Sequence, residues 1–170
     1  MLVPLLSLIG CQHIVALPAI KPIEGDTIPV SARVEIPAES ANRVHKVRRS
    51  FAAGIASRWT IEVGDALVRY AQAYLTPVFP AGDDVVIEIS IDRFGIAMFR
   101  AVLDARISVT RDGRAVFDKQ LRIASKRDRY VAQMGRAQSM DSTLRDTTDE
   151  ALRSLFEQFL EDARRSYPSW

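Results

Sequence analysis

Three alternating segments in the middle of the chain constrain the fold more than any other feature. Residues 85–91, 101–109 and 115–123 carry an apolar side chain at nearly every second position, and a period of two places those side chains on one face of a β-strand. Asp112-Gly113 separates the last two segments and favours a type I′ hairpin turn. The pattern predicts three consecutive antiparallel strands with the inward side chains Val85, Ile87, Ile89, Ile91, Ala101, Leu103, Ala105, Ile107, Val109, Phe117, Leu121 and Ile123.

The opposite face of these strands is polar. Its residues are mainly charged, and acids and bases opposed on neighbouring strands suit a face that meets water. The side chains predicted on this face include Glu88, Asp92, Asp104, Arg106, Asp118 and Arg122.

Two helices flank the three strands. Residues 63–79 and 140–167 each repeat apolar residues at helical spacing, which predicts one buried stripe per helix. Pro77 ends the first helix, and Ser139 or Asp141 caps the second. The two stripes comprise Val63, Leu67, Tyr70 or Ala71, Tyr74 and Val78, and then Leu144, Thr148, Leu152, Leu155, Phe159, Leu160 and Ala163.

Shorter extended segments precede the first helix. Residues 30–36 alternate, with Val30, Ala32, Val34 and Ile36 on one side. The next residues predict a second strand that ends near Phe51, a bend at 52–54 and an extended run through Trp59 to Ile61. Because helices and antiparallel strands are segregated along the chain, the expected fold class is α+β. We expect a two-layer sandwich in which two helices cover one face of a single, mainly antiparallel sheet.

The N-terminus has the pattern of an export signal. Residues 2–10 form an uncharged apolar run that is too short to cross a bilayer, which needs about 20 helical residues, and that has the length of a signal-peptide core. The usual Lys or Arg ahead of this run is missing, so a start upstream of Met1 stays open. The segment 8–11, LIGC, resembles the lipobox of bacterial lipoproteins, and Cys11 is the sole cysteine.

The lipobox resemblance implies lipid attachment to the Cys11 sulfur, cleavage after Gly10 and acylation of the new amino terminus. An Asp directly after the cysteine would imply retention in the inner membrane. Gln12 stands at this position instead, which implies the outer membrane, with the domain facing the periplasm. The expected organisation is a signal peptide at 1–10, a lipidated cysteine with a Pro-rich tether at 11–29, and a single α+β domain at 30–170. A chance apolar start with an ordinary thiol is the alternative.

The layout of the whole chain resembles small periplasm-facing lipoproteins of Gram-negative bacteria. It is similar to the YajG-like lipoproteins and to the auxiliary lipoproteins of ABC-type lipid transport systems. The second group is suggested by DRF at 92–94, RDGRAVF at 111–117 and EALRSLFEQFLEDA at 150–163. The segment RWTIEVGDAL at 58–67 departs from both groups. The resemblance transfers no functional residue other than Cys11.

Charge and residue types argue against several functions. The 23 basic and 21 acidic residues are interspersed, whereas a nucleic-acid platform needs a basic face. His13 and His45, the only histidines, have neither a serine motif nor metal-ligand spacing around them. No Gly-rich phosphate loop occurs. We expect no enzyme, catalytic residue, metal or cofactor, although a carboxylate pair for glycoside hydrolysis stays open.

One basic cluster is a candidate binding site. It comprises Arg43, Lys46, Arg48 and Arg49, and a second cluster follows at 126–129. The simpler interpretation is solvated strand edges, where positive side chains block edge pairing. The functional interpretation is contact with an anionic surface such as lipid headgroups, since each cation adds about 1 kcal/mol there.

Three functions remain after these exclusions. The favoured one is a non-catalytic, lipid-anchored envelope lipoprotein that binds a protein partner in the periplasm as an assembly or scaffolding accessory. The second is an auxiliary component of an ABC-type lipid transport system, which predicts an apolar groove beside the helix at 63–79. The third is an envelope hydrolase with a deep cleft that gathers Asp or Glu. The sequence leaves the oligomeric state open.

Overall fold

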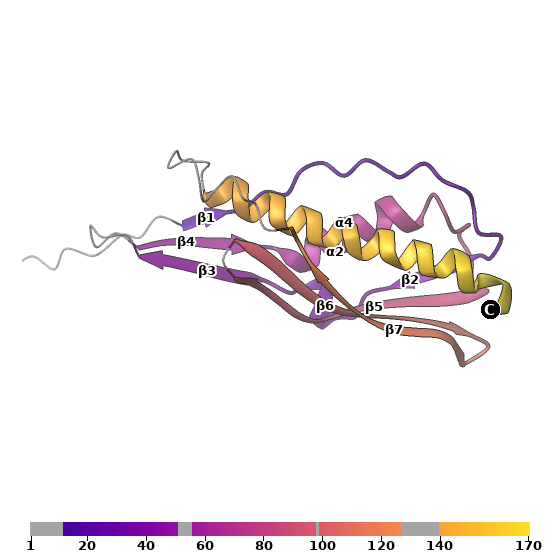
Figure 1. The fold of residues 1–170 in the computed structure, drawn as a ribbon. Helices are drawn as coiled ribbons and strands as arrows, with labels where there is room; N and C mark the ends of the chain where they lie inside the picture. Colours follow the sequence, from indigo (N-terminus) through magenta and orange to yellow (C-terminus); the bar gives the residue numbers. More distant parts are fainter. Residues whose placement is uncertain (1–11, 51–55, 98, 127–139) are drawn as a thin grey trace, which may run out of the picture.

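The computed structural model describes residues 12–50, 56–97, 99–126 and 140–170. Its regular elements form a helical layer above a layer of strands, and Figure 1 shows the α2 and α4 helices on the same side of the strands. The predicted α+β class with two helices on one face is therefore confirmed. The elements are β1 (Gln12–Ile14), β2 (Ala32–Glu35), α1 (Ala38–Ala41), β3 (His45–Ser50), β4 (Ala56–Ile61), α2 (Val63–Leu75), β5 (Val85–Ala97), β6 (Arg100–Arg111), β7 (Arg114–Ala124), α4 (Met140–Ser166) and a 3-10 turn (Tyr167–Ser169).

The three predicted central strands are confirmed as β5, β6 and β7. β6 pairs antiparallel with both neighbours, and the turn residues Asp112 and Gly113 have φ values of 49° and 75°. The polar face carries the expected cross-strand pairs, since Arg106 lies 2.5 Å from the Asp118 carboxylate and Arg122 lies 3.5 Å from Asp104. The inward residues are buried, except that Phe117 is half-buried.

The strands form two sheets instead of one. One sheet has the order β1-β4-β3, and the other has the order β2-β5-β6-β7. Two short strands, β1 and β2, join their sheets by parallel pairing with β4 and β5. The single sheet expected from the sequence is divided because a period of two assigns side chains to faces but does not select the partner of a strand.

Both predicted helices form, and their stripes make the centre of the core. The α2 helix ends at Leu75, and Thr76 is its C-terminal cap. This end is expected ahead of Pro77, because proline has no N–H with which to continue the helical hydrogen bonds. All predicted stripe residues of both helices are buried. The Tyr70 hydroxyl of α2 donates a hydrogen bond to the Asp149 carboxylate of α4, which joins the two helices. Ser139, one predicted cap, lies outside the described residues, and Asp141 is in the first turn of α4.

The segment predicted as a tether packs along the domain. After β1, residues 15–31 run extended beside the helical layer (Figure 1). Val15 and Ile28 are buried, and their N–H groups donate to the carbonyl oxygens of Thr60 and Val78, each over 2.9 Å. This backbone pairing holds the segment against β4 and the end of α2, so residues 12–31 belong to the packed structure.

The inward assignment of Val34 differs from the structure. β2 is the edge strand of the four-stranded sheet, and Val34 is 38% exposed. Val30, Ala32 and Ile36 are half-buried against the core. An edge strand has a neighbour on one side only, so alternation along β2 does not produce full burial.

Candidate functional site

The three strands of the smaller sheet bring basic residues together. The register pairs Gln12 of β1 with Arg58 of β4, and Arg58 with Arg48 of β3. Residues paired across strands, and residues two apart on one strand, share a face of the sheet. Lys46, Arg48 and Arg58 therefore lie on one face, and all three side chains are exposed. We call this surface the cationic face.

Only part of the predicted basic cluster belongs to the cationic face. Lys46 and Arg48 do, whereas Arg43 is held by the fold, since its Nη1 atom donates to the Asp92 carbonyl oxygen over 2.9 Å. The side chain of Arg49 lies outside the described residues. In the second cluster, the backbone N–H of Lys126 donates to the Glu150 carboxylate over 3.1 Å, and residues 127–139 lie outside the described part.

The cationic face surrounds a hollow of about 310 Å³. The hollow is lined by Gln12, Lys46, Val47, Arg48, Arg58, Trp59 and Thr60. None of its three cations forms an ion pair with any residue that the structure describes. The sequence explains this, because residues 40–61 contain no Asp or Glu, and the first acidic residue of the chain is Glu24. The positive charge of this face is therefore uncompensated within its own sheet.

The other face of this sheet is packed. The Trp59 ring is buried, and it stacks on the His13 ring with centroids 5.4 Å apart. His45 meets Phe94 of β5 edge-on at 5.3 Å, and burial lowers the pKa of its imidazole below the ordinary 6.5. These contacts fix the side of the sheet that points inward, and so leave the cationic face toward solvent.

A second hollow lies beside α2. Its volume is about 220 Å³, and it lies between the edge strand β2, the α1 helix and one side of α2. We call it the α2 hollow. Its lining is mostly apolar and contains no charged residue: Val34, Ile36, Ala41, Val68, Ala71, Gln72 and Thr76. The apolar groove that the transport hypothesis places beside residues 63–79 therefore has a counterpart at this position.

The two hollows lack the side chains that the hydrolase hypothesis needs. Neither hollow is lined by Asp, Glu, His or Ser, which are common acid–base and nucleophilic groups in hydrolases. Within the described ranges, no group of three or more His, Cys, Asp or Glu side chains is placed to hold a metal ion. Also in the described part, no helix is long and apolar enough to span a bilayer. Cys11 lies outside the described residues, so lipidation stays a prediction.

Comparisons with known proteins show the fold and no more. No protein-family model and no curated protein sequence matches the chain. A crystal structure of a Xanthomonas campestris protein described as DUF330 is similar over 94% of this chain and 95% of its own, with a TM-score of 0.52 and 11% identity. A crystal structure of "a putative lipoprotein from Caulobacter crescentus" matches over 56% of this chain and 76% of its own at 14% identity, with a TM-score of 0.29 that is too low to indicate a common fold. At such identities the first likeness extends to the fold alone, and the YajG-like resemblance stays a prediction.

Sequence reasoning missed Arg58 although a signal was present. A hairpin centred on residue 53, the middle of the bend expected at 52–54, would pair position 48 with position 58; the bend itself lies outside the described residues. The observed register has this pairing. The α2 hollow had no comparable signal in its own residues, because it arises where a strand, a short helix and a long helix meet.

Proposed function

We propose that this chain is a lipid-anchored envelope protein without catalytic activity, whose domain binds an envelope polypeptide at the α2 hollow. The α2 hollow carries this proposal, because it is an apolar depression next to an edge strand. Lipidation of Cys11 and location at the outer membrane belong to the same proposal and are supported by the LIGC segment.

The size of the α2 hollow favours a protein partner. Its volume of about 220 Å³ is smaller than that of typical small-molecule sites, which occupy roughly 300–1,000 Å³. A hollow of this size suits the apolar side chains of a partner. Val34 lies at its rim and is unusually exposed for an aliphatic side chain on a strand.

The edge of the four-stranded sheet offers a second element of recognition. β2 is the outermost strand next to the hollow, and outer strands present backbone groups that an extended peptide can pair with. We therefore expect the partner to supply an extended segment along β2 and to place its apolar side chains against Val68 and Ala71 of α2. Strand addition of this kind combines backbone hydrogen bonds with side-chain pockets.

Site-specific photocrosslinking in cells tests the partner. A photoreactive amino acid at Val68 is expected to give a discrete adduct with one envelope polypeptide, and the same residue at Arg114 of β7, the opposite edge of the four-stranded sheet from β2, is expected to give none. Val34→Asp should remove the Val68 adduct, because it buries a charge in the contact. The proposal fails if Val68 gives no adduct, or if the adduct survives Val34→Asp in a protein of unchanged thermal stability.

Replacement of Cys11 tests the anchor separately. After a high-salt wash, which screens surface charge, Cys11→Ser is expected to move the protein from the membrane to the soluble fraction and to abolish labelling by a fatty-acid probe, whereas Ser7→Ala should leave both unchanged. Sucrose-gradient separation of the two envelope membranes then tests the outer-membrane location. Unchanged sedimentation and labelling of Cys11→Ser would refute the anchor without affecting the crosslinking result.

A second candidate function is auxiliary protein of an ABC-type lipid transport system. The observation that favours it is the position of the α2 hollow, since that hypothesis places an apolar groove beside residues 63–79. The identity of the Val68 adduct distinguishes the two candidates. A transporter subunit, encoded beside this gene with a permease and an ATPase, supports the transport function, and an unrelated envelope protein contradicts it.

A further inference from the structure

We propose that the cationic face is a membrane-docking surface, in which Lys46, Arg48 and Arg58 contact the phosphates of anionic lipid headgroups while the neighbouring aliphatic side chains enter the bilayer interface. The orientation of this surface toward the anchoring membrane rests on the proposed lipidation of Cys11. The affinity of the surface for anionic lipid does not depend on that lipidation.

The position of β1 relative to the anchor supports this inference. Cys11 and Gln12 are adjacent in the sequence, so their Cα atoms are about 3.8 Å apart. Gln12 is paired with Arg58, and neighbouring strands lie about 4.8 Å apart. A lipid attached at Cys11 would therefore hold the edge of this sheet at the depth of the headgroups, where Arg58 and Arg48 follow on the next two strands.

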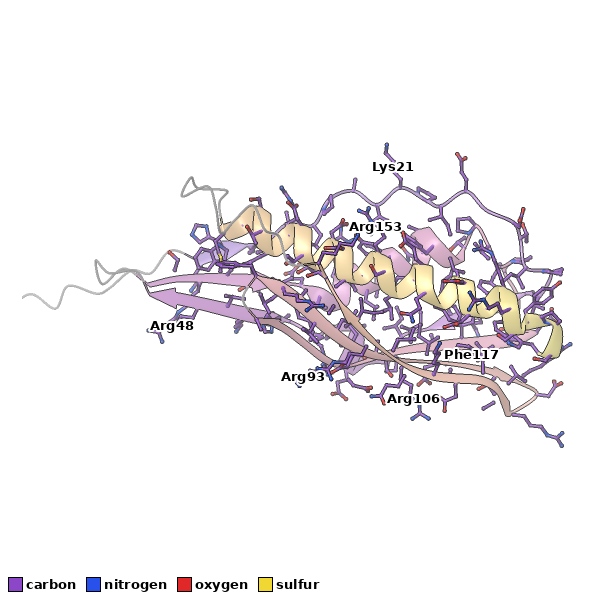
Figure 2. All side chains as sticks on the ribbon, in the orientation of Figure 1. Lys21, Arg48, Arg93, Arg106, Phe117 and Arg153 are labelled. Carbon is purple, nitrogen blue, oxygen red and sulfur yellow. The ribbon has the colours of Figure 1, made fainter. Side chains whose placement is uncertain are left out.

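The charge of the surface suits anionic headgroups. Lys46, Arg48 and Arg58 are exposed and have no acidic partner among the described residues, whereas Arg106 and Arg122 of the larger sheet are paired with carboxylates. Figure 2 shows Arg48 projecting from β3 on the side of the strands away from α4. Unpaired basic side chains beside a membrane are attracted by its negative surface potential.

The apolar side chains on the same surface point to a membrane and not to a soluble polyanion. Ile14, 69% exposed, pairs with Thr60 and shares a face with Gln12 and Arg58. Val44, immediately before β3, is 48% exposed. These are the two most exposed large aliphatic side chains in the described part of the chain. Aliphatic residues placed among cations are typical of surfaces that lie in the membrane interface.

The hollow within the cationic face provides room for a headgroup. At about 310 Å³ it falls within the size range of small-ligand sites, roughly 300–1,000 Å³. Its rim carries two guanidinium groups, Arg48 and Arg58, which bind phosphate oxygens in a bidentate manner. Lys46 adds a third positive charge beside them. One lipid phosphate can therefore be held at the hollow while further headgroups contact the surrounding cations.

Vesicle flotation of the full chain carrying Cys11→Ser tests the docking surface without the lipid. Binding to vesicles of phosphatidylethanolamine and phosphatidylglycerol is compared with binding to vesicles of phosphatidylethanolamine and phosphatidylcholine. We expect strong preference for the anionic vesicles and weaker binding at high salt, which screens surface charge. Equal binding to both kinds of vesicle would overturn the proposal.

Two triple variants in the same Cys11→Ser background assign the effect to this surface. Lys46→Gln with Arg48→Gln and Arg58→Gln should weaken binding to anionic vesicles about a hundredfold, since each cation near such a surface accounts for roughly a fivefold change. The control variant removes the same charge at three exposed positions elsewhere, with Lys21→Gln, Arg114→Gln and Arg164→Gln, and should bind within a few-fold of the parent. Similar losses in both variants would show a general effect of net charge and refute the site.

A third variant tests the aliphatic contribution. Ile14→Ser with Val44→Ser should weaken binding to anionic vesicles about tenfold or more, because two aliphatic side chains leave the interface, while selectivity against zwitterionic vesicles persists. Unchanged affinity of this variant would contradict insertion of these side chains. Labelling by a fatty-acid probe and sedimentation after a high-salt wash, which screens surface charge, report on Cys11 alone, so failure of the docking surface and failure of the anchor give different results.

Discussion

The indole of Trp170 stacks on the ring of Phe79, with centroids 6.2 Å apart and ring planes 6° from parallel. Phe79 follows α2, and Trp170 follows the 3-10 turn after α4. Phe117 of β7 and Phe159 of α4 complete the cluster, since the Phe117 ring lies 6.2 Å from Trp170 and 5.7 Å from Phe159. Figure 2 shows Phe117 on β7. The cluster joins the two helices to β7, the outer strand opposite β2 in the four-stranded sheet.

Trp170→Ala should therefore lower the free energy of unfolding by about 3 kcal/mol, because it removes a buried aromatic side chain. The substitution also removes the hydrogen bond that the indole N–H donates to the Ser166 Oγ atom over 3.0 Å. Urea unfolding followed by circular dichroism measures the change. Ser169→Ala, at an exposed neighbouring position, should change the free energy by less than about 0.5 kcal/mol. Equal effects of the two substitutions would contradict the structural role of the indole.

Gly64, in the first turn of α2, permits close approach of α1. A Cβ atom at this position would lie 2.2 Å from the Ala41 carbonyl oxygen, and the Gly64 N–H donates to the Arg43 carbonyl oxygen over 2.9 Å. Gly64→Ala should destabilise the protein by about 2 kcal/mol, since backbone must move to remove the overlap. Urea unfolding measures the change, as a shift of the midpoint without a change in the dependence of the unfolding free energy on urea concentration.

Gly95 provides the matched control for Gly64. It lies in β5, and a Cβ atom there would meet nothing within 4 Å. Gly95→Ala is expected to be neutral or to stabilise by about 0.5 kcal/mol, because alanine loses less backbone entropy on folding. A cost for Gly95→Ala as large as that for Gly64→Ala would show that the α1–α2 contact is not the cause.

The elements predicted from the sequence are those long enough for their hydrophobic period to repeat several times. β5, β6 and β7 have 11 to 13 residues each and α4 has 27, so their alternation or helical spacing repeats several times within one element. β1 has three residues and α1 has four, which is too short for a period to be recognised. Their formation depends on partners elsewhere, since β1 pairs with β4 more than forty positions along the chain.

The residues of the cationic face could be predicted only in part from the sequence. Lys46 and Arg48 were identified because they are close in the sequence, but Arg43, equally close, is held by the Asp92 carbonyl group. Arg58 joins the face only through the pairing of β3 with β4. Proximity along the chain predicted a cluster, whereas strand pairing determines which of its members share a surface.

Two adjacent threonines in α4 should respond in opposite ways to substitution by valine. The Thr148 hydroxyl is buried and has no hydrogen-bond partner among the described residues, whereas the Thr147 hydroxyl donates to the Thr143 carbonyl oxygen over 2.9 Å. Thr148→Val should raise the free energy of unfolding by about 1 kcal/mol, because a buried polar group without a partner is unfavourable. Thr147→Val should lower it by a similar amount. Urea unfolding of both variants tests this, and a loss of stability in Thr148→Val would contradict it.

The stability of the fold should fall as His45 becomes protonated. Burial beside Phe94 lowers the imidazole pKa in the folded state below the ordinary 6.5, so the unfolded chain takes up the proton first. The contribution of neutral His45 is therefore complete above pH 6.5 and is lost as the pH falls from there through the lowered folded-state pKa. His45→Leu should reduce the difference between the urea midpoints at about pH 7.5 and about pH 5.5. His13→Gln, at the other histidine, should retain the difference, and an unchanged difference in His45→Leu would assign the pH dependence to another group.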